Sequence, residues 1–207
     1  MKKTVITVSA LTASAAAMAL ATALPAAAQD AGTMTLALGV GVVRPASDNG
    51  TLAGGAVPLE IGNNARPTIA FEYFIRDNIG LELLGATPFK HGLSSNGAYI
   101  GQTKHLPPTL SINYHIPTGG KFTPFVGAGI NYTVFFDESS PLGNLKIDDS
   151  VGFALHAGVD YALSDKGALR ADLRYIQIEP DVSLNGASIG TAKINPLVAG
   201  VAYVMKF

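Results

Sequence analysis

The sequence predicts an all-β protein, an eight-stranded antiparallel transmembrane β-barrel of the outer-membrane type. Three observations predict this fold: eight segments alternate in side-chain character, the connections between them alternate in length, and the chain ends on an aromatic residue. In the final segment, residues 194–207, Tyr203, Met205 and Phe207 fall on one face. Strict alternation over this length indicates a strand with two different environments.

The first residues favour secretion. Lys2 and Lys3 precede an apolar, alanine-rich run at residues 5–24, and Pro25 and three alanines follow it. A basic start, an apolar run and small residues at its end are typical of a secretory signal peptide. We therefore expect residues 1–28 to be cleaved and residues 29–207 to form one barrel domain. An uncleaved membrane anchor is the alternative.

The predicted strands follow one another along the rest of the chain. They are residues 33–43, 68–75, 79–87, 109–116, 123–136, 151–163, 168–178 and 194–207. Three connections are short and turn-like, whereas the other four, residues 44–67, 88–108, 137–150 and 179–193, are long and rich in Gly, Asn, Ser and Pro. This pattern is typical of a barrel with short periplasmic turns and long extracellular loops, which puts both termini in the periplasm.

Strand length and side-chain parity bear on whether the barrel is in a membrane. The strands from residue 123 onward supply the about 9–11 residues that a tilted strand needs to cross a bilayer. Residues 68–75 and 109–116 are shorter, so we expect them to extend into their loops. A soluble barrel would hold the apolar face inside, and alternation alone does not exclude it. Strand length, Phe207 and the loop asymmetry favour the membrane.

Composition excludes several classes of function. The chain has no cysteine, which rules out a disulfide scaffold, thiol chemistry and a zinc site with cysteine ligands. The formal net charge is −1, so the sequence lacks the basic surface that nucleic-acid binding requires. We expect neither a nucleic-acid partner nor a cofactor.

A set of polar residues takes the parity that faces the lumen. Eight strands enclose only enough room for side chains, and unpaired buried charges are costly. We therefore predict that these residues pair into a plug that closes the lumen, with a polar conduction path as the alternative. The residues are Glu72, Glu82, His115, His156, Asp160, Arg170, Asp172 and Arg174.

Apolar residues gather at the loop-side ends of three predicted strands. Pro88, Pro107 and Pro108 lie beside them, and proline removes donors from a strand ladder. The combination predicts a hydrophobic pocket with a gap in the barrel wall, through which a solute leaves sideways into lipid. The alternative is an aromatic girdle at the membrane surface. The pocket residues are Leu84, Phe89, Leu106, Phe135 and Phe136.

The sequence does not favour an enzyme. His156 and Asp160 share a face, but four residues on a strand span about 13 Å, too far for a direct hydrogen bond. No G-x-S-x-G motif supplies a nucleophile, and no short histidine spacing suggests a metal site. We therefore expect no catalytic and no metal-binding residues.

Four sequence runs, in this order, resemble the outer membrane protein W (OmpW) family. They are LELLGATPFKH at 81–91, HLPPTLSINYHI at 105–116, KFTPFVGAGINYTVFFDE at 121–138 and LKIDDSVGFALHAGVDYAL at 145–163. The resemblance implies an eight-stranded barrel with a narrow, mostly closed lumen, embedded in outer-membrane lipid. It also implies passive inward passage of small hydrophobic molecules.

The resemblance to outer-membrane barrels carries further expectations about partners. In that class the last strand is the signal that the barrel-assembly machinery recognises, a role that falls here on Tyr203, Met205 and Phe207. The family is also linked to phage and bacteriocin attachment. The competing function is therefore a barrel without transport that acts in envelope structure, stress or attachment through its loops.

Overall fold

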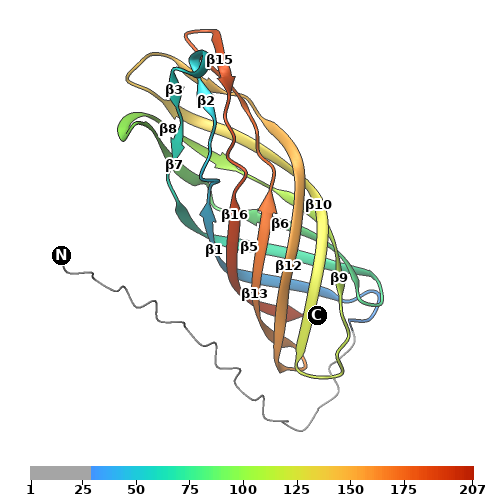
Figure 1. The fold of residues 1–207 in the computed structure, drawn as a ribbon. Helices are drawn as coiled ribbons and strands as arrows, with labels where there is room; N and C mark the ends of the chain where they lie inside the picture. Colours follow the sequence, from blue (N-terminus) through green and yellow to red (C-terminus); the bar gives the residue numbers. More distant parts are fainter. Residues whose placement is uncertain (1–28) are drawn as a thin grey trace, which may run out of the picture.

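The computed structural model describes residues 29–207, and the expected signal peptide, residues 1–28, lies outside them. In this part of the chain eight antiparallel strands form a closed barrel (Figure 1). This confirms the predicted fold class. The barrel strands are β1 (Met34–Arg44), β5 (Asn64–Arg76), β6 (Ile79–Ala86), β9 (Thr109–His115), β10 (Phe122–Ser139), β12 (Ser150–Ser164), β13 (Gly167–Ile176) and β16 (Leu197–Lys206).

The last strand closes the barrel against the first. Their register runs from Thr35↔Lys206 to Arg44↔Leu197, so the two strands pair over their whole length. Because the eight barrel strands close on themselves, each of them has a paired neighbour on both sides. Residue 29 and the C-terminus lie at the rim that carries the short turns, called here the turn end, and the opposite rim is called the loop end (Figure 1).

The two faces of the sheet differ in polarity. Leu38 and Val40 of β1 are 47% and 52% exposed on the outside, whereas Glu82 and Arg174 are 0% and 2% exposed inside the barrel. An apolar exterior around a polar interior is the arrangement of a membrane barrel. A soluble barrel has the reverse arrangement, so that alternative is excluded.

The long connections contain strands of their own. Residues 88–108 form a hairpin because alternation continues through Phe89, His91 and Leu93. Its turn at Asn96-Gly97 has φ values of 49° and 75°, as a tight two-residue hairpin turn requires. The additional strands are β2 (Thr51–Leu52), β3 (Val57–Pro58), β4 (Glu60–Ile61), β7 (Phe89–Ser95), β8 (Ala98–Leu106), β11 (Leu145–Ile147), β14 (Asp181–Leu184) and β15 (Ala187–Thr191).

Helical structure in residues 29–207 is confined to one turn. The 3-10 turn η1 (Ala53–Gly55) lies between β2 and β3. Within residues 29–207 no helix has the length and apolar character needed to cross a membrane.

Between β5 and β7 the wall of the barrel lacks a continuous ladder of backbone hydrogen bonds. β5 pairs with β6 toward the turn end, and β4 pairs with β7 toward the loop end. Between these two ladders lie Pro67 and Pro88, which have no N–H to donate. We call residues 64–67 and 87–90 the seam.

Side chains substitute for ladder bonds along the seam. The Nε–H of Arg66 donates to the carbonyl oxygen of Pro88 at 2.9 Å, and the side-chain amide of Asn64 donates to the carbonyl oxygen of Lys90. One backbone bond, from the N–H of Thr87 to the carbonyl oxygen of Pro67 (3.2 Å), also crosses it. Because side-chain rotation breaks the first two bonds, the seam opens at a lower cost than a paired ladder.

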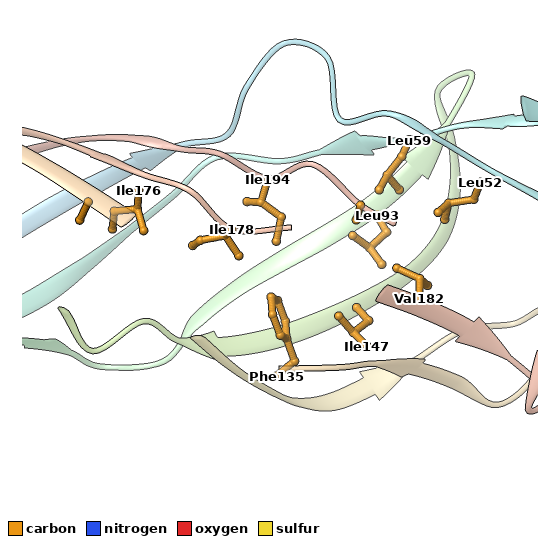
Figure 2. Packing of buried hydrophobic residues seen from close by; sticks show 11 residues of the cluster. Leu52, Leu59, Leu93, Phe135, Ile147, Ile176, Ile178, Val182 and Ile194 are labelled. Carbon is orange, nitrogen blue, oxygen red and sulfur yellow. The ribbon is translucent and has the colours of Figure 1, made fainter. Parts of the chain in front are cut away.

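The main apolar core lies at the loop end and not in the middle of the barrel. Figure 2 shows Leu93, Phe135, Ile147 and Val182 around one space, and these residues come from β7, β10, β11 and β14. A smaller apolar cluster of Ala37, Ala70 and Val204 lies among inward-facing residues of β1, β5 and β16. The loop-end strands therefore bury apolar surface that a barrel of this width cannot enclose in its polar lumen.

Candidate functional site

Arg170 of β13 is the most connected group in the lumen. Its Nε–H donates to Oδ1 of Asp160 at 2.8 Å, and its Nη1–H donates to Oε2 of Glu82 at 2.8 Å. Its Nη2–H donates to Asp160 Oδ2 (2.9 Å) and to Glu72 Oε2 (3.4 Å). One guanidinium thus links three carboxylates that come from β5, β6 and β12.

Arg174, four residues further along β13, extends the network. Its Nη2–H donates to Oε1 of Glu82 at 2.6 Å and to Nδ1 of His156 at 3.0 Å. His156 in turn donates from Nε2 to Asp172 Oδ2 at 3.1 Å. His115 Nε2 lies 2.9 Å from Glu72 Oε1, on the far side of the network. The structure therefore brings all eight predicted plug residues into one connected group.

An aromatic ring that the sequence analysis did not single out completes this layer. Phe125 is 1% exposed, and the Arg170 guanidinium lies 4.5 Å from its ring centroid. The ring fits because Gly158 on β12 has no side chain, since a Cβ there would lie 2.6 Å from Phe125 Cζ. The sequence indicates that Phe125 faces the lumen, because it has the same parity as the lumen-facing Asn131 and Phe135 on the same strand.

The ion-pair network divides the interior into separate compartments. A cavity of about 110 Å³ lies at the turn end, and a smaller one of about 40 Å³ lies against Arg174 and Asp172. A third, of about 120 Å³, lies at the loop end, and we call it the loop-end cavity. These three cavities share no lining residue, so the network and its neighbours separate them along the barrel axis.

All four long connections contribute to the loop-end cavity. Its wall is almost wholly apolar because each connection turns alternate apolar side chains inward. Representative lining residues, in chain order, are Leu52, Leu59, Leu93, Ile100, Leu145, Ile147, Val182 and Ile194. In the sequence, this wall is indicated only by apolar residues that recur within the Gly- and Ser-rich connections.

The polar side chains of the loop-end cavity differ in how their hydrogen bonds are used. Among the described residues that line it, the hydroxyls of Thr103 and Ser140 donate to backbone carbonyl groups at 3.2 and 2.6 Å. The other two polar residues that can donate or accept are His91 and His105, whose ring centroids lie 4.9 Å apart. They form a local polar spot in an apolar wall.

Both histidines belong to the β7–β8 hairpin, which lies beyond the β6–β9 ladder at the loop end. His91 Nδ1 donates to the carbonyl oxygen of Gly62 at 2.6 Å. Burial lowers the pKa of His91, and burial together with the neighbouring His91 lowers the pKa of His105 to about 3. At neutral pH both rings are therefore uncharged.

The five residues predicted to form a hydrophobic pocket do not gather in one place. Phe135 lines the loop-end cavity, and Phe89 lies behind it, with its ring centroid 5.5 Å from that of His105. Leu106 and Phe136 have the opposite parity to the inward-facing His105 and Phe135, so they are not part of the cavity wall. Leu84 lines the small cavity beside Arg174 instead. Consecutive residues on a strand face opposite sides of the sheet, so Phe135 and Phe136 cannot both face one pocket.

A closed barrel with an apolar exterior, a charged interior and one loop-covered end is the architecture of an integral outer-membrane protein. The family model described as the OmpW family matches residues 30–207. The chain belongs to the OmpW family.

Known proteins agree with this assignment over most of the chain. Outer membrane protein W of Vibrio cholerae is 35% identical over an alignment 209 residues long, which covers 93% of this chain and 96% of that protein. Outer membrane protein W of Escherichia coli is 36% identical over 161 residues, 73% of this chain and 76% of that protein. The crystal structure of the outer membrane protein OprG from Pseudomonas aeruginosa matches with a TM-score of 0.75 and 30% identity, covering 86% of this chain and 97% of that one.

A more distant relative has a name that refers to metabolism. The dibenzothiophene metabolism operon protein PahQ of Pseudomonas aeruginosa is 28% identical over 153 residues, 70% of this chain and 72% of that protein.

Proposed function

We propose that this protein lets small hydrophobic molecules pass inward across the outer membrane without an energy source. The observation that carries the proposal is the loop-end cavity, an apolar space lined by all four long connections. In this proposal the loop end faces the medium and both termini face the periplasm. A hydrophobic solute leaves water for the cavity because transfer of apolar surface out of water is favourable.

The route onward is sideways and not along the axis. Below the cavity, Arg170 and Arg174 are each bound to more than one acceptor, and a passing solute would have to separate these buried charges. Breaking a buried ion pair is strongly unfavourable. The seam offers a cheaper exit, because Arg66 and Asn64 hold it through side chains.

The relative named for a dibenzothiophene metabolism operon supports the same class of solute. Dibenzothiophene is an uncharged aromatic molecule, which is the chemistry that an apolar cavity accepts. At 28% identity this relative supports the class of solute and not the particular compound.

Uptake of naphthalene by cells tests the proposal. Cells that lack the gene should take up naphthalene more slowly than cells that carry it on a plasmid. No difference would contradict the transport function and favour a role in envelope structure or attachment.

Loosening the seam tests the exit route. The double variant Asn64→Ala/Arg66→Ala removes the two side-chain hydrogen bonds that cross the seam and should take up naphthalene faster than the wild type. The matched control is Lys104→Ala, which removes an exposed ion pair outside the seam and should leave uptake unchanged. Unchanged uptake in the double variant would show that solute leaves elsewhere.

A further inference from the structure

We propose that the loop-end cavity selects hydrophobic molecules that carry one uncharged hydroxyl group, which hydrogen bonds to His91 and His105. The inference deepens the proposed function and rests on it for the solute's route. It adds the chemical class of the ligand and the two residues that recognise it.

The first step is the unused hydrogen-bonding capacity of the two rings. Both histidines line the cavity and are 2% and 1% exposed, respectively. Within residues 29–207, His91 Nε2 and both ring nitrogens of His105 have no hydrogen-bond partner. Buried polar atoms without partners are rare, because each costs the desolvation of that group. Apolar residues would fill the same wall without this cost.

The second step is the direction of each hydrogen bond. His91 Nδ1–H donates to the carbonyl oxygen of Gly62, so a neutral His91 presents Nε2 as an acceptor. A neutral His105 offers one N–H donor and one acceptor nitrogen. The ring centroids lie 4.9 Å apart with an interplanar angle of 34°, so one hydroxyl at the edges of the two rings can reach a nitrogen of each.

The third step is the ligand group that satisfies both rings. A hydroxyl donates one hydrogen bond and accepts others, so it can donate to His91 and accept from His105. An alkane does neither, and an ether or ketone only accepts. A carboxylate cannot donate, and its charge is unfavourable in an apolar wall without a cation. The remaining wall, including Leu52 and Val182, takes the hydrocarbon part of the molecule.

Binding to the purified protein in lipid nanodiscs tests this class. The probes are 1-octanol, its isomer 1-methoxyheptane, which accepts but does not donate, and sodium octanoate. Binding is measured by titration calorimetry, with the heat from empty nanodiscs subtracted. We expect 1-octanol to bind about tenfold more tightly than the ether, because it makes one more hydrogen bond. Octanoate should bind more weakly than either uncharged probe. Equal affinities for 1-octanol and the ether would overturn the proposal.

The variant His91→Phe removes the acceptor nitrogen to which only the hydroxyl can donate, and it keeps a ring beside Phe89 and His105. It should bind 1-octanol and the ether equally. The control is Lys104→Gln, whose side chain lies outside the cavity in an exposed ion pair with Asp137, and it should keep the preference. A preference that persists in His91→Phe would overturn the role of the histidines.

A spectroscopic measurement on the unmodified protein does not depend on the variant folding. Adding 1-octanol should shift the imidazole nitrogen resonances of His91 and His105 and leave those of the plug residue His115 unchanged. If the resonances of His91 and His105 do not shift, the proposal is contradicted. If 1-octanol binds in this way but cells show no uptake, the transport function fails and the binding site stands. If uptake occurs but binding shows no preference for the hydroxyl group, the binding site fails and the transport function stands.

Discussion

Arg170 shows how much of the barrel depends on a single side chain. It binds Asp160, Glu82 and Glu72, all of which are buried. Its removal leaves three carboxylates in the lumen with one cation fewer, so we expect Arg170→Ala to lower the free energy of unfolding by about 3–5 kcal/mol. Urea unfolding in lipid vesicles and heat-modifiability on gels measure this loss.

The control for Arg170 is an ion pair at the surface. Lys104 and Asp137 lie 2.9 Å apart with side chains 42% and 61% exposed. We expect Lys104→Ala to cost less than about 1 kcal/mol, because exposed pairs are screened by water. Equal losses for the two variants would contradict a structural role for the Arg170 network.

His105 makes stability depend on pH in a predictable direction. Its pKa in the folded protein is lowered from 6.5 to about 3 by burial, so the unfolded chain binds a proton at higher pH than the folded chain does. Stability contributed by the neutral ring is therefore lost as the pH falls from about 6.5 toward 3, with a slope of up to about 1.4 kcal/mol per pH unit.

The variant His105→Phe isolates this effect from other titrating groups. Phenylalanine takes up no proton, so the wild type should lose more unfolding free energy than the variant between pH 7 and pH 4.5. Parallel urea unfolding series at the two pH values measure the difference. A gap between wild type and variant that does not change with pH would rule out titration of His105.

At the scale of the element, β16 has two tasks. It closes the barrel against β1, and the backbone N–H of Phe207 donates to the carbonyl oxygen of Met34 at 2.9 Å. The Phe207 side chain is 68% exposed, so it contributes little to packing within the chain. Its role as part of an assembly signal, with Tyr203 and Met205, is a proposal.

Deletion of Phe207 separates the two tasks. We expect the shortened chain to reach the outer membrane in smaller amounts, while uptake per inserted molecule stays close to that of the wild type. Immunoblots of outer-membrane fractions, combined with uptake normalised to protein amount, test this. Tyr99→Ala, a change at an exposed loop-end residue that does not line the loop-end cavity, serves as the control for substitution itself. Normal membrane levels without Phe207 would contradict the proposal.

At the scale of the whole molecule, orientation decides which compartment supplies the solute. The absence of cysteine allows single labels at either end of the barrel. Leu142→Cys, at the loop end, should react with a membrane-impermeant maleimide on intact cells. Thr118→Cys, at the turn end, should react only after the outer membrane is permeabilised. Labelling of Thr118→Cys on intact cells would reverse the proposed orientation.

The barrel was predictable because its signals are local. Each strand shows a period of two in its own residues. Charged residues that take the lumen-facing parity, such as Arg170 and Glu82, can pair only with one another inside so narrow a barrel. The loop end was not predictable in this way. Leu52 and Val182 are far apart in the sequence, and only the pairing of β2, β11, β14 and β15 with their neighbours brings them together. Leu106 was assigned to the pocket from its proximity to Pro107, without the parity that turns it away.

The shared wall of the loop-end cavity has a consequence for how its preference can change. Each long connection supplies a separate portion of the wall and joins its own two barrel strands, and the β4–β7, β8–β10 and β11–β14 pairings join it to its neighbours. Exchange of a single connection with that of a relative therefore replaces one portion and leaves the lumen network intact. Solute preference becomes modular: four segments can be recombined on one unchanged barrel, and chimeras can be sorted by which solutes they admit.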